Sequence, residues 1–207
     1  MDIRTIWTSS EHGPWKAALD AYWEMIPEVL RSREERMEKL SLDDIRDLSA
    51  RSWFAFLHDE YFPWKYTQAN RLATSRRWLQ KQVETDGVEG IDTIRQRLLS
   101  VDEEEVARPL HIAMRIKGLG PAGATGLLSV MYPAFFGTVD RFVAENLRSA
   151  MPEVAEFNEM NPGSLTGLDA VLLTEVLREK ARLLTSALGH PWTPRMVDQV
   201  LWAVRPG

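Results

Sequence analysis

Apolar residues recur mostly at helical spacing along this chain, and no sustained alternation of apolar and polar residues indicates a strand. Glycine and proline interrupt the pattern and mark where the expected helices end. Pro27 is expected to kink the first helix. The pattern therefore predicts an all-α fold. The predicted helical segments are 14–36, 70–83, 91–99, 103–116, 121–131, 140–151, 169–188 and 194–204.

Length and composition narrow the class of protein. A chain of 207 residues fits one domain or two closely packed helical lobes, and we expect 1–207 to form a single helical domain. Hydrophobic residues at 44% and charged residues at 27% are ordinary for a globular protein. No apolar run approaches the roughly 18 to 20 residues of a membrane-spanning helix, and the amino terminus shows no export signal. We therefore expect a cytoplasmic protein with no membrane partner.

The cysteine and histidine content excludes several kinds of site. The sequence contains no cysteine, which excludes disulfides, thiolate zinc sites, a cysteine nucleophile and a cysteine-held iron–sulfur cluster. Its histidines, His12, His58, His111 and His190, show no paired metal-ligand spacing. We therefore expect no metal site.

Charge is distributed unevenly along the chain. The formal net charge of −5 argues against a protein that coats nucleic acid through bulk positive charge. Residues 1–60 carry 8 Lys/Arg against 13 Asp/Glu, whereas 61–100 carry 7 against 4 and 106–150 carry 5 against 2. The middle of the chain is thus locally basic, and it contains the motif described next.

A short glycine turn separates two of the predicted helices. Gly118-Leu119-Gly120 follows the segment that ends at Ile116, and Pro121 opens the next helix. Glycine permits positive φ and close approach of another backbone, while proline suits the first helical turn because its missing N–H is not needed there. The free amides at a helix amino end attract an anion, and a nucleic-acid phosphate is a natural occupant.

Basic side chains surround this turn. Lys117, Arg115 and Arg108 could add screened, sequence-independent attraction to a nucleic-acid backbone. An ordinary helical hairpin explains the same glycines, because such turns join helices in many proteins. The turn alone does not separate these two interpretations.

The residues that follow extend the pattern. One helix after the turn, Val139 and Asp140 open another predicted helix. This combination resembles the helix-hairpin-helix DNA glycosylase superfamily, in which Gly-hydrophobic-Gly is followed by such a Val-Asp pair. The resemblance implies two closely packed helical lobes, a helix-hairpin-helix at 106–131, and duplex DNA as the partner. It allows a monovalent cation at the turn and implies no other cofactor. The implied DNA-backbone contacts are Arg115, Lys117, Gly118, Leu119, Gly120 and Ala122.

The resemblance also implies a chemistry. Asp140 would stabilise positive charge on the sugar, or activate water, as the base leaves. Bifunctional members carry a nucleophilic lysine two residues after the second glycine, where this chain has Ala122, and Lys117 lies on the other side of the turn. The implied reaction is therefore monofunctional hydrolysis of a base–sugar bond with water as the nucleophile. Thr138 departs from the proline that many members have.

Three alternatives stay open. Aspartate is a favoured N-cap, so Asp140 could serve only to begin its helix. The chain could be a non-catalytic helix-hairpin-helix DNA-binding protein, or a helical module that binds a protein partner.

Aromatic residues supply candidates for a base pocket, because aromatic faces stack on an extruded base. Tyr61, Trp64 and Tyr66 are the candidates here, although eight tryptophans in a helical protein usually indicate core packing. Several basic residues fall on neighbouring turns of one predicted helix and could form a second backbone-binding face, although a solvated surface is the favoured interpretation. They are Arg71, Arg76, Arg77 and Lys81.

Overall fold

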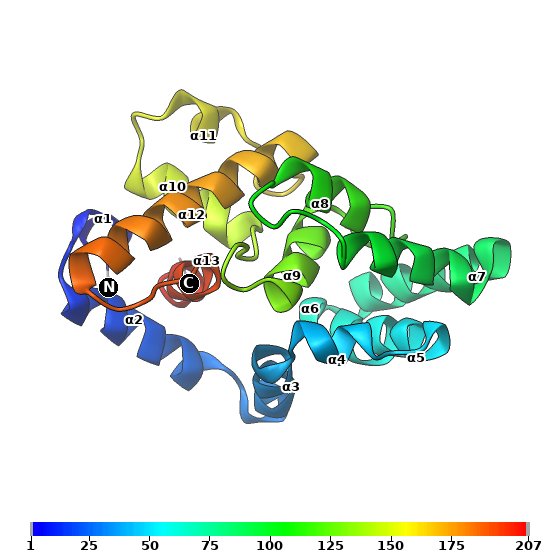
Figure 1. The fold of residues 1–207 in the computed structure, drawn as a ribbon. Coiled ribbons are helices and arrows are strands. Elements are labelled where there is room, and N and C mark those ends of the chain that lie inside the picture. Colours follow the sequence, from blue (N-terminus) through cyan, green and yellow to red (C-terminus); the bar gives the residue numbers. More distant parts are fainter. Residues whose placement is uncertain (1, 206–207) are drawn as a thin grey trace.

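The computed structural model describes residues 2–205, and within this range the chain forms helices and no strands (Figure 1). The predicted all-α class is therefore confirmed. No helix in the described range is long and apolar enough to cross a bilayer. The helices are α1 Ile3–Thr8, α2 His12–Met25, α3 Glu28–Lys39, α4 Leu42–Arg46, α5 Ala50–Ala55, the π-helix Phe56–Tyr61, α6 Phe62–Lys65, α7 Ala69–Leu98, α8 Ala107–Ala113, α9 Pro121–Met131, α10 Arg141–Ala150, α11 Ala155–Glu159, α12 Gly167–Leu188 and α13 Pro194–Ala203.

Helices from the two ends of the chain pack together. The last helix, α13, lies against α2 and α12, and α1 lies against α10. A second group contains most of the remaining helices: α7 contacts α5, α6 and α8, and α9 contacts α8 and α12 (Figure 1). The short α11 lies against α10. This arrangement brings α6, from the first third of the chain, close to the carboxyl-terminal helices.

Several predicted boundaries need correction. The segment 14–36 is two helices, because Pro27 has an extended ψ of 139° and starts a new helix instead of kinking one. The segments 70–83 and 91–99 both lie within α7, which is kinked at Gly87, where the backbone is non-helical with a φ of 71°. The predicted interruption between the two segments is therefore present, as a kink. The segment 103–116 contains only the short α8, and the acidic residues before it form turns.

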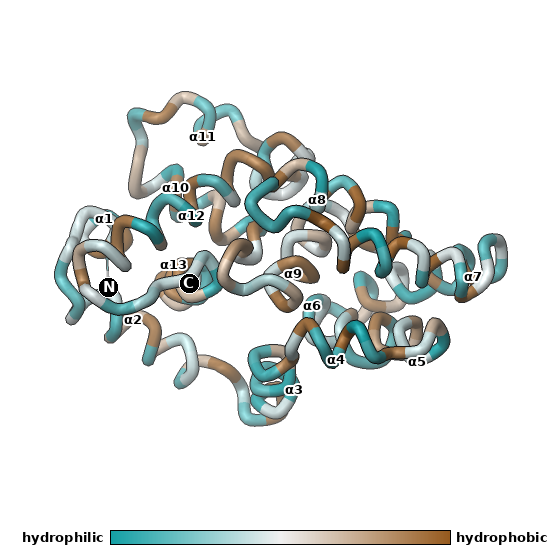
Figure 2. Tube along the Cα trace, in the orientation of Figure 1, coloured by the Kyte–Doolittle hydropathy of each residue, from teal (hydrophilic) through white to brown (hydrophobic). Residues whose placement is uncertain are grey.

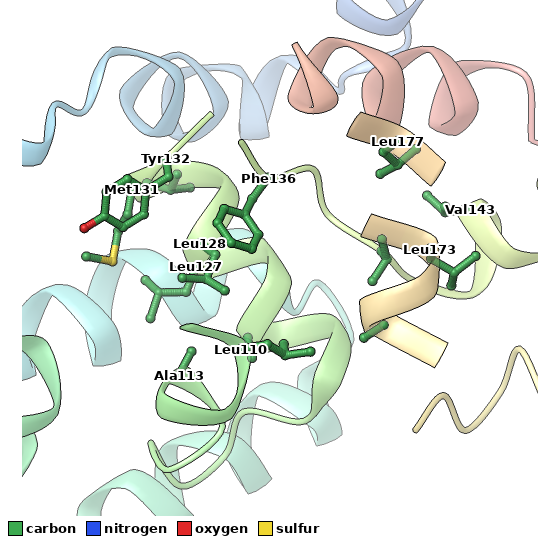
Figure 3. Packing of buried hydrophobic residues seen from close by; sticks show 14 of the residues in the cluster. Leu110, Ala113, Leu127, Leu128, Met131, Tyr132, Phe136, Val143, Leu173 and Leu177 are labelled. Carbon is green, nitrogen blue, oxygen red and sulfur yellow. The ribbon is translucent and has the colours of Figure 1, made fainter. Parts of the chain in front are cut away.

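The core is centred on α9. Nine consecutive residues of this helix, Gly123 to Met131, are buried, so α9 has no solvated face over that stretch. Figure 3 shows Leu127 and Leu128 near Leu110 and Ala113 of α8, and Met131 beside Tyr132. The helix also contacts α12. In contrast, α3 is mostly hydrophilic (Figure 2). Because α9 is close-packed on all sides, the turn before it and the loop after it are held firmly in place.

Candidate functional site

A cavity of about 330 Å³ opens between α2, α3, α6, α10 and α13. Its wall combines acidic, basic and aromatic side chains drawn from both ends and the middle of the chain. Such a concave site with a few converging polar groups is the usual form of a ligand-binding pocket. The side chains on which the argument below depends are Glu34, Trp64, Lys65, Asp140, Arg195 and Asp198.

Asp140 lies on the cavity wall, and its two carboxylate oxygens make different contacts. Its Oδ1 accepts hydrogen bonds from the backbone amides of Phe142 at 2.9 Å and Val143 at 3.4 Å, which caps α10. Its Oδ2 points instead toward the Nζ atom of Lys65, 3.8 Å away. The cap predicted for this helix is therefore present, and it leaves one oxygen of Asp140 available to the cavity.

Lys65 brings an amine into the site from the end of α6. Only 11% of its side chain is exposed. Its stem runs past Gly126 of α9, where an added Cβ would lie 3.2 Å from the Lys65 Cδ. Glycine at this position therefore makes room for the lysine. Burial lowers the pKa of Lys65, while the charge of Asp140 opposes that shift.

Two tyrosines anchor α6 and the preceding π-helix to α9. The Tyr61 hydroxyl donates to the Gly123 carbonyl at 2.5 Å, and the Tyr66 hydroxyl donates to the Gly118 carbonyl at 3.1 Å. Both tyrosines are buried and do not line this cavity. Of the three aromatic candidates, Trp64 alone lines the cavity. The structural demand of fixing α6 against α9 accounts for the other two.

An ionic cluster centred on the buried Arg195 lies at the cavity wall. Arg195 contacts Glu34 at 2.6 Å, Glu38 at 3.6 Å and Asp198 at 3.2 Å. The Trp64 indole also donates to Glu34, at 2.6 Å. These contacts join α3 and α6 to α13, so the cavity wall is held by charge-assisted hydrogen bonds in addition to apolar packing.

Asp198 is the most strongly perturbed acid in this cluster. Burial raises its pKa to about 7, although Arg195 and the Thr138 amide, which donates to Asp198 Oδ2 at 2.5 Å, act in the opposite direction. Thr138, which departs from the resembling family's proline, therefore uses an N–H that proline lacks to bond this acid.

Aromatic side chains flank the opening of the cavity. Phe142 and Trp202 both line it, and the Arg205 guanidinium lies 3.5 Å from the centre of the Trp202 ring and 5.6 Å from that of Phe142. The Arg205 guanidinium thus lies next to the Trp202 and Phe142 rings, near Asp140.

The turn between α8 and α9, residues 114–120, is fixed by α7. Gly118 has a φ of 95°, and an added Cβ would lie 2.6 Å from the Ser75 carbonyl oxygen. The Ser75 hydroxyl donates to the Gly118 carbonyl at 3.2 Å. Gln82 donates to the Arg115 carbonyl and accepts from the Lys117 amide. Glycine is required at position 118 both for its conformation and for this close approach.

The amino end of α9 faces outward from this turn. No described side chain caps it, and the exposed Lys117 lies beside it in the chain. Arg71 of α7 approaches the same end, with a guanidinium nitrogen 4.0 Å from the position of a Cβ on Gly120. Arg71 and Lys117 form no ion pair within residues 2–205. Free amides and two unpaired cations make this an anion-attracting surface.

Sequence reasoning missed two residues of these two sites and ranked a third low. Lys65 carried no local signal beyond an aromatic-rich run, and Asp198 stood in a helix expected to be structural. Arg71 was considered for a second backbone-binding face, but a solvated surface was favoured. Their placement depends on how distant helices pack. The other predicted backbone contacts, Arg115, Leu119 and Ala122, lie in or next to the turn, where Leu119 is buried as a packing residue.

Comparisons with known proteins leave the family open. No protein-family model matches the chain, and no curated protein or solved structure shows significant similarity to it. No cluster of three or more potential metal-ligating side chains occurs in the described part of the chain.

Proposed function

We propose that the protein is a DNA-binding N-glycosylase that releases a base by hydrolysis, with Asp140 as its catalytic carboxylate. The observation that carries this proposal is the division of the Asp140 carboxylate, whose Oδ1 caps α10 while Oδ2 faces a cavity next to Lys65. An aspartate that served only as a cap would not need a cavity in front of its second oxygen. The resemblance to the helix-hairpin-helix DNA glycosylases supports the same assignment.

In the proposed reaction, the C1′–N bond of an extruded nucleotide breaks and its electron pair leaves with the base. Positive charge develops on C1′ and the ring oxygen of the sugar, and the Asp140 carboxylate stabilises it. Water then adds to C1′, and the proton that it gives up is balanced by the proton that the departing base takes up, which leaves an abasic sugar and the free base. Trp64 and Phe142 supply aromatic faces in the cavity for the extruded base.

The α8–α9 turn is the proposed DNA-backbone contact and corresponds to the hairpin of the resembling family. The uncapped amides of α9 would bind a phosphate, with Lys117 and Arg71 adding charge. The Gly118 carbonyl already accepts hydrogen bonds from Tyr66 and Ser75, so a monovalent cation there would share this oxygen with two hydroxyls. Contacts of this kind bind duplex DNA with little sequence preference.

One observation favours a second chemistry in the same cavity. Although Ala122 stands where bifunctional members of the family have lysine, Lys65 places an amine 3.8 Å from Asp140. Because burial lowers its pKa, a larger fraction of this amine is neutral and nucleophilic at neutral pH. A neutral amine adds to the aldehyde carbon of a ring-opened abasic sugar and expels water to form an imine. The reaction with water remains the primary proposal, because it needs only Asp140.

The test of the proposed function compares the protein with its Asp140→Asn variant. Asparagine caps a helix about as well as aspartate, so the variant should fold and bind DNA while losing base release. Binding without release by both proteins across damaged duplexes would favour the non-catalytic DNA-binding alternative. Failure of the protein to bind duplex DNA at low salt, where backbone contacts are strongest, would contradict both the glycosylase proposal and the non-catalytic DNA-binding alternative. A helical module that binds a protein partner would then be the remaining alternative.

A further inference from the structure

Trp78 of α7 exposes a large aromatic surface. Its exposed fraction is 46%, and within residues 2–205 it is the one aromatic residue among the exposed large hydrophobic side chains. The others are Met25, Val29, Leu168 and Leu183. An isolated exposed aliphatic residue needs no special explanation, but an exposed indole next to a ligand-binding surface has a specific chemistry.

The position of Trp78 places it beside the α8–α9 turn. Ser75 and Gln82, which hydrogen-bond to that turn, lie three residues before and four residues after Trp78 on the same helix. Residues at this spacing share one face of an α-helix. Trp78 therefore lies between the two anchors of the turn, on the edge of that face that is open to solvent.

The surroundings of Trp78 are polar and basic. The Lys81 ammonium lies 5.6 Å from the centre of the Trp78 ring, and Lys117 and Arg71 flank the same turn. Thr74, at the neighbouring helical position, is exposed and polar. A protein partner would require a continuous apolar patch around the indole, which these residues do not provide. An aromatic face with flanking cations instead matches a polyanion that carries planar rings.

We propose that Trp78 stacks on an unpaired base of single-stranded DNA whose backbone is bound at the α8–α9 turn. This inference rests on the proposed role of the turn in binding DNA. In a duplex the faces of the bases are covered by their neighbours, so an indole at the surface reaches a base face only where the strand is unpaired. Phosphate at the turn and a base on Trp78 are the two contacts that proteins combine to hold single strands.

The test measures the affinity of the full chain for a single-stranded oligothymidylate and for a duplex of the same length at low salt. Trp78→Ala should weaken single-strand binding on the order of 10-fold and duplex binding by less than about 2-fold. Trp78→Phe should retain most of the single-strand affinity, because it keeps an aromatic face. Leu183→Ala, which removes an equally exposed apolar side chain from α12, is the matched control. It should bind the single strand and the duplex with the affinities of the parent protein.

The outcomes separate this inference from the function on which it rests. Equal losses of single-strand and duplex affinity in Trp78→Ala, or no loss in either, would overturn the role of Trp78 while leaving DNA binding intact. Binding of the duplex alone by the parent protein would also overturn it. Binding of neither form would remove the proposed function and this inference together. Thermal melting of Trp78→Ala, whose side chain is half exposed, checks that the fold is retained.

Discussion

The Nζ atom of Lys65 lies 3.8 Å from Oδ2 of Asp140, although the two residues belong to helices that are distant in the sequence. Gly126 leaves room for two side chains here, since an added Cβ would lie 2.8 Å from the Tyr61 hydroxyl and 3.2 Å from the Lys65 Cδ. The contact joins the acid suggested by the sequence to an amine that the sequence did not suggest. The cavity wall therefore carries a carboxylate and an amine next to each other.

The role of Lys65 can be tested with a duplex that contains an abasic site. If the amine forms an imine with the sugar aldehyde, borohydride should reduce it to a stable covalent complex that mass spectrometry assigns to Lys65. Lys65→Gln should then give no complex, because its amide is not nucleophilic. Lys16→Gln, which changes an exposed lysine of α2, is the control. It should form as much of the reduced covalent complex as the parent protein does. A complex that survives Lys65→Gln would contradict this chemistry.

The contribution of the turn to DNA binding has a salt-dependent signature. Each cation that contacts a phosphate releases counterions, so Lys117→Gln and Arg71→Gln should each reduce the slope of log affinity against log salt by about 1. Arg182→Gln, on the exposed surface of α12, should leave the slope unchanged. Unchanged slopes in all three variants would place the DNA contact elsewhere on the protein.

Gly118→Ala should destabilise the protein. The new Cβ would need a positive φ and would collide with the Ser75 backbone, so we expect the free energy of unfolding to fall by about 2 kcal/mol or more. Gly13→Ala is the matched control, because nothing lies within 4 Å of its Cβ position in α2. That variant should be neutral or slightly more stable. Urea unfolding measures both, and equal stabilities would show that the turn is not constrained by α7.

Stability should depend on pH through Asp198. Its pKa of about 7 in the folded protein exceeds the ordinary 3.8, so the folded state binds this proton more tightly. The resulting stabilisation is complete below about pH 4 and is lost as the pH rises through about 7. Asp198→Asn removes the titration, so its free energy of unfolding should fall less than that of the parent between about pH 5 and about pH 8.

The control for this pH dependence is Asp20→Asn, which changes an acid whose side chain is 56% exposed. Its unfolding free energy should follow the pH dependence of the parent protein. Parallel curves for the parent and both variants would show that Asp198 ionises normally in the folded state.

Local sequence signals predicted much of the fold. Apolar spacing and capping residues gave the all-α class, and the segments 121–131, 140–151 and 194–204 match α9, α10 and α13 within about two residues. Gly87 marked the interruption between the segments 70–83 and 91–99, and its positive φ kinks α7 at that point. The π-helix that precedes α6 lacked a recognisable periodic signal, because its spacing differs little from that of an α-helix over so few residues.

The candidate site was less predictable. Asp140 could be found because its cap and its Val-Asp context are local in sequence. Lys65 could not, because its approach to Asp140 depends on the absent side chain of Gly126 and on the docking of α6 against α9. Arg195 and Glu34 meet only when the two ends of the chain pack together. Such tertiary contacts leave no periodic pattern in a single sequence.

Base release from a panel of duplexes carrying deaminated, alkylated, oxidised or mismatched bases tests the central claim most directly. The parent protein should release free base from at least one duplex, and Asp140→Asn should slow release by about 100-fold or more while keeping DNA affinity and stability near those of the parent. Asp140→Ala, which also loses the cap, should be less stable by about 1 kcal/mol. Release by Asp140→Asn at the parental rate would contradict the assignment of Asp140 as the catalytic carboxylate.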